Sequence, residues 1–421
     1  MAGILTRLLV VLLADNRLNP PWGGLGDAPA YFLLAHNIAT GKGYAYAGFA
    51  TAYRPPIYPL LLAGGIKVFD SHAFEAVRLV QFLMGLAVVY LCASVAGNLF
   101  GKDEKRAALV LALFFPTLVI MTGDILTEAT ATLISALFLY LFVRFFQRPS
   151  WAILAGLSVC VGVATLIRFN MALLGIVVLA VVLLQQKTLP KWRAAALMIC
   201  LSGLVVSPWL VRNYRAFHGR LLLSTESGPA AVMGVLTPQG RALPGDSARL
   251  RRALGWVPPA DIETNAPSRA QFGSEAELNR KAWRVAFGLW RHTGWRLVPL
   301  TLEKLSYFWL STDQLLWTRS FRPLVRAARA GGVLVYWVLL AFGIAGWFRL
   351  RSRSSGLARV FLFYVILATV LHVPFNMNTR LRMPFIDPLL AILAAGQLSF
   401  FNRRASPVRE SAQGLTSSEA R

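Results

Sequence analysis

The stretch that decides the fold is Val77–Phe100, which reads VRLVQFLMGLAVVYLCASVAGNLF. It is mostly apolar, and in a helix about 20 residues cross the ~30 Å hydrocarbon core of a bilayer. Further apolar runs approach that length: Ala107–Met121, Glu128–Phe146, Trp151–Ile167, Met171–Gln185, Ala194–Val211, Gly331–Leu350, Arg359–Phe375 and Met383–Phe401. The sequence therefore predicts an all-α polytopic membrane protein.

The composition supports the same fold class. Of the 421 residues, 56% are hydrophobic and 15% are charged, with a mean hydropathy of +0.55. Ordinary soluble domains carry about 25% charged residues. The amino-terminal run Ile4–Ala14 is short and contains Arg7, so it is either a first span or the core of a signal peptide. With a first span included, we expect about ten transmembrane helices.

Basic residues in the short loops predict the orientation. They fall in every second connection: Lys102, Lys105 and Arg106; Arg144 and Arg148; Lys187, Lys191 and Arg193; Arg349, Arg351, Arg353 and Arg359; Arg403 and Arg404. Cytoplasmic loops are enriched in Lys and Arg. The other connections are then extracytoplasmic: 15–76, 122–127, the turn at 168–170, 212–330 and 374–382. We expect a multi-pass protein of the inner (plasma) membrane.

The chain divides into four predicted regions. Residues 1–211 are predicted to form an amino-terminal transmembrane module with a long first outer loop, and residues 212–330 an extracytoplasmic segment. Residues 331–401 return to the membrane, and residues 402–421 form a cytoplasmic disordered tail. Four stretches are expected to lie at the outer interface as short or amphipathic helices: Tyr31–Thr40, Ile57–Phe69, Glu275–His292 and Leu297–Leu316.

The formal net charge is +24. Nucleic-acid binding is disfavoured, because the basic residues are split between both faces and no recognised motif is present. Two explanations of the positive charge remain: attraction to lipid headgroups, and binding of a negatively charged lipid substrate. Cys92, Cys160 and Cys200 lie inside predicted spans, so no disulfide framework is implied.

The candidate functional residues all fall on the predicted outer side. Asp27 lies in Gly26-Asp27-Ala28-Pro29-Ala30-Tyr31, and Arg54 opens Arg54-Pro55-Pro56-Ile57-Tyr58-Pro59. Asp124 lies in a short loop, and Glu128 opens the span that follows it. Further arginines border spans: Arg168, Arg212, Arg380 and Arg382. An acid can accept the proton of a hydroxyl, and an arginine can hold a phosphate.

Each of these residues also has an ordinary structural explanation. Asp27 can cap the helix that follows it. Arg54 can be a solvated residue held extended by the following proline. Asp124 and Glu128 can interact favourably with the dipole of the helix that begins there. The remaining arginines can anchor the protein at the lipid headgroups. Their order along the chain and their common side favour the functional interpretation.

As a set, these motifs resemble the GT-C class of membrane glycosyltransferases. The chain is similar to the bacterial relatives of protein O-mannosyltransferases and lipid A aminoarabinose transferases. Two further blocks carry the resemblance, Ser207-Pro208-Trp209-Leu210-Val211-Arg212-Asn213-Tyr214 and Arg380-Leu381-Arg382-Met383-Pro384 followed by Pro388. The resemblance extends roughly from Asp15 to Gln397.

The resemblance implies a sugar donor carried on a polyprenyl phosphate and an inverting transfer on the extracytoplasmic face. It implies that Asp27 is the catalytic base and that Arg54 helps to hold the lipid phosphate. The acceptor is then a hydroxyl of an envelope glycan, a lipid or a protein. The other expected substrate-binding residues are Tyr58, Asp124, Glu128, Arg168, Arg212, Arg380 and Arg382.

One departure bears on metal binding. Many relatives carry a second acid directly after the first, whereas this chain has Ala28. No cofactor is certain, and a divalent cation is left open, with Asp124 or Glu128 as substitutes for the second acid. Two rival functions are a polyprenyl-linked lipid carrier or flippase, and a non-catalytic subunit of an envelope polysaccharide machine. The flippase predicts polar span centres and pseudo-symmetric halves, which the sequence does not show clearly.

Overall fold

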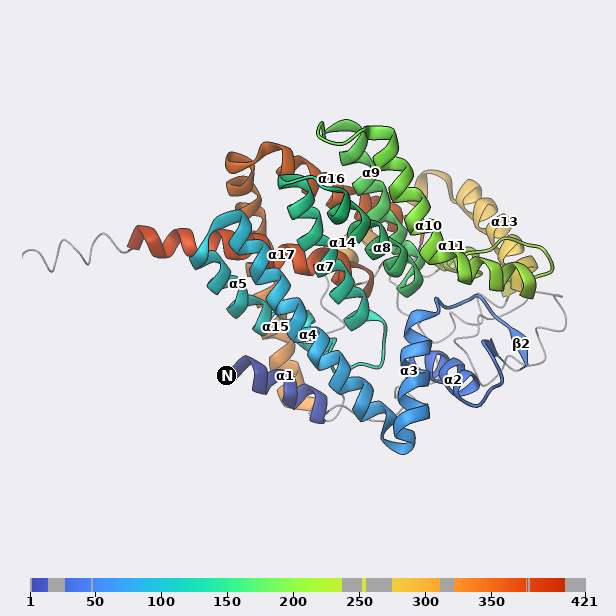
Figure 1. The fold of residues 1–421 in the computed structure, drawn as a ribbon. Helices are drawn as coiled ribbons and strands as arrows, with labels where there is room; N and C mark the ends of the chain where they lie inside the picture. Colours follow the sequence, from blue (N-terminus) through green and yellow to red (C-terminus); the bar gives the residue numbers. More distant parts are fainter. Residues whose placement is uncertain are drawn as a thin grey trace, which may run out of the picture.

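A computed structural model describes residues 2–13, 27–46, 48–236, 252–254, 275–310, 322–375, 377 and 379–405. These residues are almost entirely helical (Figure 1). The helices are α1 (Ala2–Leu13), α2 (Asp27–Ala39), α3 (Ile57–Phe69), α4 (Ala73–Phe100), α5 (Lys102–Phe114), α6 (Pro116–Ile120), α7 (Glu128–Gln147), α8 (Trp151–Ile167), α9 (Leu173–Leu184), α10 (Lys191–Ala216), α11 (Ser227–Leu236), α13 (Glu275–Thr293), α14 (Leu297–Leu310), α15 (Arg322–Arg353), α16 (Ser355–His372) and α17 (Thr379–Ala405). Three 3-10 turns, η1 (Asp70–His72), η2 (Phe169–Ala172) and η3 (Gly294–Arg296), and a small antiparallel hairpin of β1 (Ala45–Tyr46) and β2 (Phe49–Ala50) complete the described elements.

The structure confirms an all-α multi-pass membrane protein. Among the described residues, six helical stretches are long and apolar enough to cross a bilayer: Ile57–Phe100, Glu128–Gln147, Lys191–Ala216, Gly331–Arg353, Ser355–His372 and Thr379–Leu398. Shorter apolar helices, α8 among them, lie beside these. The expected number of about ten spans therefore stays a prediction.

Several predicted boundaries differ from the helices. The proposed divisions after residues 211 and 330 fall inside α10 and α15, which both continue beyond the apolar core of their sequences. The predicted interfacial helix Ile57–Phe69 matches α3, and at 1.5 Å per residue its 13 residues reach only about 20 Å. It turns back at η1 into α4. Most of the tail, residues 406–421, lies outside the described residues.

The predicted span Ala107–Met121 is wrong as a single helix. It breaks at Phe115, because Pro116 cannot continue the hydrogen bonds of α5 and instead starts α6. The buried guanidinium of Arg7 fills this break: Nη2 donates to the carbonyl of Ala112 at 2.6 Å and Nη1 to that of Leu118 at 2.8 Å. The arginine that interrupts the first apolar run is thus bound inside the protein.

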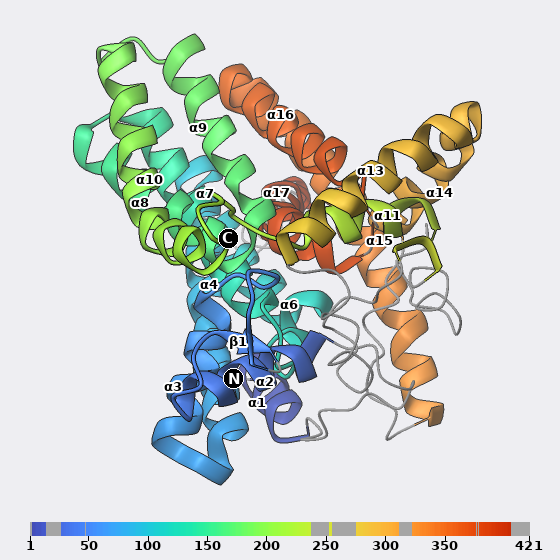
Figure 2. The same ribbon diagram turned by 90° about the vertical axis from the view of Figure 1, so that its right-hand side faces the viewer.

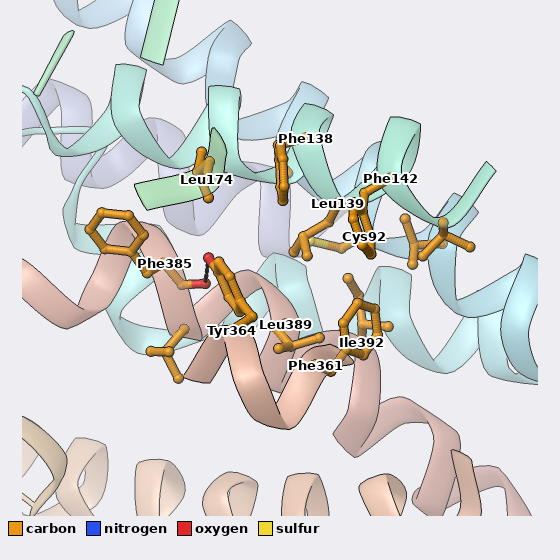
Figure 3. Close-up of a cluster of buried hydrophobic side chains, with 14 of the residues drawn as sticks. Cys92, Phe138, Leu139, Phe142, Leu174, Phe361, Tyr364, Phe385, Leu389 and Ile392 are labelled. Atoms are coloured by element: carbon orange, nitrogen blue, oxygen red, sulfur yellow. Dashed lines mark hydrogen bonds between the residues drawn. The ribbon is translucent and has the colours of Figure 1, made fainter. Parts of the chain in front are cut away.

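The core lies where the carboxyl-terminal helices cross the amino-terminal bundle (Figure 3). Phe138 of α7, Leu174 of α9 and Leu389 of α17 are buried together there. The hydroxyl of Tyr364 in α16 donates to the carbonyl of Phe385 in α17 at 2.7 Å. These contacts hold α17 between its neighbours and thereby set the position of its first turn.

One end of the molecule gathers the short elements. The α2–β2 segment, α11 and α13 lie together on the right of Figure 1, opposite the carboxyl-terminal part of α17, and this end faces the viewer in Figure 2. The sequence predicts that α13 lies at the outer interface, with its apolar face on the membrane surface. Instead, Ala282 and Val285 of that face pack with Ala231 and Val232 of α11. The helical periodicity of the sequence indicates that α13 has an apolar face, but it does not indicate that α11 packs against this face.

Candidate active site

Charged side chains from six separate segments meet at this end of the molecule. They belong to Asp27, Arg54, Glu128, Arg168, Glu226 and Arg380, which we call the charge cluster. Most of them stand at the start of a helix or just before one. The cluster therefore brings together the amino-terminal ends of α2, α7, α11 and α17, whose dipoles favour negative charge.

Asp27 is bound by two arginines. One carboxylate oxygen forms an ion pair with Arg54 Nη2, and the other lies 2.9 Å from Arg380 Nη1. Burial alone would raise the pKa of Asp27, but the cations of Arg54, Arg380 and Arg168 hold it well below its usual value. The carboxylate therefore stays ionised as long as these arginines surround it.

Glu128 forms the second bridge of the cluster. Its Oε1 contacts Arg380 Nε and lies 2.9 Å from Arg168 Nη2, with only 4% of the side chain exposed. Arg168 Nε also donates to Thr127 Oγ1 at 2.8 Å. Arg380 follows Thr379 at the start of α17, where a cation opposes the helix dipole. The two carboxylates that flank Arg380 offset this cost.

Arg54 is enclosed on all sides. Its guanidinium carbon lies 5.2 Å from the ring centre of Tyr31 and 5.0 Å from that of Tyr53, distances typical of cation–π contacts. Opposite Asp27, its Nη1 lies 2.8 Å from Glu226 Oε1. Burial raises the pKa of Tyr31 to about 12, so its phenol stays neutral beside the arginine.

Glu275 ties together the two loops that carry Arg54 and Glu226. Its carboxylate accepts hydrogen bonds from Thr51 Oγ1 at 2.8 Å, from the amide of Ala52 at 3.0 Å and from Thr225 Oγ1 at 2.9 Å. The amide of Thr225 also donates to the Ala52 carbonyl at 3.2 Å. The first residue of α13 thus sets the distance between the two loops.

Asp124 lies beside the cluster and is half-buried. Burial raises its pKa to about 6, helped by the negative charge of Glu128 and opposed by Arg380 and Arg78. Its loop is held by Gln81, whose amide donates to the Asp124 carbonyl oxygen at 2.8 Å. Asp124 is therefore a carboxyl whose pKa lies close to neutral pH, at the edge of a group of fixed charges.

Of the predicted site residues, Asp27, Arg54, Glu128, Arg168 and Arg380 meet in the cluster. Arg212 does not, because its guanidinium holds the hairpin loop from outside. Its Nη1 donates to the carbonyl of Thr51 and its Nη2 to that of Tyr44, each at 2.6 Å. The arginine also stacks on the rings of Tyr44 and Trp209.

Tyr58 and Arg382 also lie outside the cluster. Tyr58 is fully buried beneath Tyr31, with ring centres 5.2 Å apart, and its hydroxyl donates to Gln81. Arg382 is fully buried as well, 3.2 Å from Asp387, and its Nη1 donates to the Phe308 carbonyl at 2.9 Å. Both side chains support the elements around the site from within.

Glu226 and Glu275 were missed in the sequence. Glu226 follows Ser224 and Thr225 in a polar stretch without periodicity, and Glu275 begins a helix whose acids suit the dipole. A polar pair ahead of a short apolar helix was the only signal for Glu226, and such pairs are common. Their role depends on contacts with a loop far away in the sequence.

The residues present do not fit a divalent cation. Within the described ranges, no group of three or more His, Cys, Asp or Glu side chains is placed to hold a metal ion. Asp27 and Glu128 each face two arginines instead. These positively charged guanidinium groups would repel a divalent metal ion bound to the same carboxylates.

Comparison with known proteins identifies the fold class of the chain. Residues 53–211 match the family model described as dolichyl-phosphate-mannose-protein mannosyltransferase. The archaeal oligosaccharyltransferase AglB from Archaeoglobus fulgidus, solved with an inhibitory peptide and a dolichol-phosphate, superimposes with a TM-score of 0.53 at 14% identity. The overlap covers 98% of this chain and 51% of that chain. The chain has the fold of the GT-C class of membrane glycosyltransferases.

Two further proteins are similar to this chain. The lipopolysaccharide core galacturonosyltransferase RgtA of Rhizobium johnstonii is 32% identical over 206 residues, which cover 46% of this chain and 40% of RgtA. ArnT from Cupriavidus metallidurans, solved with undecaprenyl phosphate, overlaps at a TM-score of 0.42 with 15% identity, covering 94% of this chain and 76% of ArnT. The chain thus spans less than half the length of the curated relative that it matches.

Proposed function

We propose that this protein transfers a sugar from a polyprenyl-phosphate donor to a hydroxyl of an envelope glycan, a lipid or a protein. The observation that carries the proposal is the charge cluster itself. Three arginines and three carboxylates from distant segments meet among helix ends of a membrane protein. Charged groups in such proteins are expensive and mark functional sites by default.

The arginines suit the phosphate of the donor. Each guanidinium can bind two oxygens of one phosphate, and it stays charged at any physiological pH. Arg54 and Arg380 lie on opposite sides of the Asp27 carboxylate, so a phosphate near Asp27 is within reach of both. During transfer the bond from the sugar to the phosphate breaks, and the phosphate gains negative charge. Fixed cations stabilise that charge as it develops.

Asp27 is the proposed base. It would accept the proton of the incoming hydroxyl as the oxygen attacks the anomeric carbon. In the structure the two arginines hold its pKa low, which makes it a weak base. A donor phosphate that shares Arg54 and Arg380 draws positive charge away from Asp27 and thus raises its basicity. Glu128, Arg168 and Asp124 are proposed to bind substrate around it.

The relatives support the class of chemistry. RgtA is a glycosyltransferase of lipopolysaccharide core, and AglB was solved with a dolichol-phosphate, which is a polyprenyl phosphate. Because the spans are apolar, the prenyl chain can lie in the membrane beside the cluster. We place the protein in the inner membrane with the cluster on the extracytoplasmic side, as the basic loops predict.

The test is sugar transfer by the purified, detergent-stable protein, measured beside binding of undecaprenyl phosphate. In Asp27→Asn, which is nearly isosteric, we expect folding and lipid binding to persist while transfer falls about 10²–10⁴-fold, the usual contribution of general acid–base catalysis. Wild-type turnover in Asp27→Asn would remove the base assignment. Absence of transfer from every polyprenyl-phosphate sugar tried with the wild-type protein would count against the function.

A further inference from the structure

Arg54 is held between two carboxylates, and one of them has no part in the reaction proposed above. Asp27 pairs with Nη2, while Glu226 Oε1 lies 2.8 Å from Nη1. Glu226 reaches Arg54 from the segment before α11. If Arg54 binds the donor phosphate, as the proposed function holds, Glu226 occupies a guanidinium edge that the phosphate needs.

The charges of the cluster balance one for one. Its three arginines face three carboxylates, and beside it Asp124 lies near the cation of Arg78. A donor whose phosphate joins a lipid to a sugar carries one negative charge. Adding it to the closed cluster would leave an unmatched anion in a largely buried place, which is unfavourable. One carboxylate must therefore leave or take a proton when the donor binds.

Glu226 is the carboxylate best suited to leave. Among the described residues, Asp27 and Glu128 each form ion pairs with two arginines, whereas Glu226 forms one with Arg54. Its side chain is 33% exposed, against 27% for that of Asp27 and 4% for that of Glu128. Burial raises the pKa of Glu226 in spite of Arg54, while the cations lower that of Asp27. Releasing Glu226 therefore breaks one ion pair and moves a partly exposed carboxylate further into water.

We propose that Glu226 is a placeholder for the donor: it holds Arg54 in the free protein and gives up this position to the phosphate of the polyprenyl-linked sugar. The exchange makes Glu226 a determinant of specificity. A lipid-linked sugar without a phosphate charge cannot replace the carboxylate on Arg54. The neighbouring Thr225, fixed to Glu275 at 2.9 Å, keeps the segment in place, so only the Glu226 side chain needs to turn away.

The test compares the affinity of undecaprenyl phosphate for the wild-type protein and for Glu226→Gln in the same detergent. Glutamine keeps the size and a hydrogen-bond acceptor but removes the charge that competes with the phosphate. We expect Glu226→Gln to bind the lipid about tenfold more tightly at about pH 8, the lower range for a charge-assisted contact. Glu277→Gln is the matched control, because Glu277 pairs with Arg220 at 3.1 Å outside the cluster.

The pH dependence gives a second, independent readout. The phosphate of the probe itself titrates near pH 6, but the ratio of the two affinities at one pH cancels that effect. The charged groups that face Glu226 are Arg54, Asp27, Arg168 and Arg380, and they are common to both proteins. As the pH falls through the raised pKa of Glu226, the wild-type carboxylate becomes neutral, so the ratio should approach one.

The outcomes separate this inference from the proposed function. Equal or weaker binding by Glu226→Gln, together with a loss of binding in Arg54→Ala, would overturn the placeholder and leave the phosphate site intact. Unchanged binding in Arg54→Ala would overturn the phosphate site itself. Should Glu226→Gln fail to fold, Glu226→Ala tests the same exchange, and weaker binding by that variant would also contradict it.

Discussion

Arg380 and Asp27 lie near opposite ends of the chain, yet their side chains form an ion pair of 2.9 Å. This pair closes the charge cluster between the start of α2 and the start of α17. Because Arg380 also contacts Glu128, it links the two carboxylates that would otherwise repel each other. The proposed phosphate site therefore depends on how α17 is packed as much as on the first outer loop.

Arg54 should act mainly on the lipid phosphate. Arg54→Ala should lose more affinity for undecaprenyl phosphate than Arg54→Lys, because lysine keeps the charge but not the planar fork. A charge-assisted contact contributes about 1.5–3 kcal/mol, or roughly tenfold to a few hundredfold in affinity. Titration of the lipid into the purified variants measures this. Arg220→Ala, at an ion pair outside the cluster, is the control and should bind normally.

Arg212 should stabilise the fold rather than bind substrate. Arg212→Ala leaves the carbonyls of Tyr44 and Thr51 without this donor, at a cost of about 1–3 kcal/mol for an unsatisfied buried group. Thermal unfolding in detergent should show the loss. Arg215→Ala, on the exposed side of the same helix, should change stability by less than about 0.5 kcal/mol. Equal stability of the two variants would contradict this assignment.

Asp124 should make stability depend on pH. Its pKa in the folded protein is raised to about 6, so its contribution is fully present below the pKa of an unfolded aspartate and is lost as pH rises through about 6. Asp124→Asn should then be more stable than wild type by up to about 3 kcal/mol at neutral pH and equally stable in acid. Thermal unfolding across this range measures the difference, with exposed Asp103→Asn as control.

The same Asp124→Asn variant also tests the predicted role of Asp124 in binding substrate. If this role is correct, the variant gains stability at neutral pH while its transfer rate falls. Full activity together with higher stability would show that the raised pKa has no function.

The predicted orientation can be tested with single cysteines. Lys42→Cys and Arg291→Cys should react with an impermeant thiol reagent in intact cells, whereas Asp103→Cys and Arg351→Cys should react only after permeabilisation. All four positions are exposed. Exposed Cys200 should first be replaced by serine, while Cys92 and Cys160 are buried. Labelling at Arg351→Cys from outside would reverse the predicted sides of the carboxyl-terminal helices.

The sequence predicted the helical class because apolar runs of membrane length have few alternative structures. It also placed Asp27, Arg54 and Glu128 on one side, since the loops alternate in charge. It did not separate Arg380, which enters the cluster, from Arg382, which binds Asp387 in the interior. The two arginines are two residues apart on one helix, so they point in different directions, and only the packing of α17 decides which of them meets Asp27.

The break at Pro116 had a visible signal, because proline inside a predicted span interrupts its hydrogen bonds. The position of Arg7 in that break had none, since it depends on the packing of α1 against α5 and α6. Glu226 and Glu275 were likewise beyond reach: their partners, Arg54 and Thr51, belong to a loop encoded much earlier. Ion pairs between distant loops leave no periodic trace in the sequence.

The position of Arg380 also has a consequence for how the protein is made. Ribosomes build the chain from its amino end, so Asp27, Arg54, Glu128, Arg168 and Glu226 are all in place before Arg380 is synthesised. Until α17 inserts, the growing protein holds three carboxylates against two arginines at this site. One of the three carboxylates then lacks a partner, and because burying an unpaired charge is unfavourable, we expect the loops to close tightly only after α17 is present. Insertion of α17 brings in Arg380 and thereby completes the charge balance of the cluster.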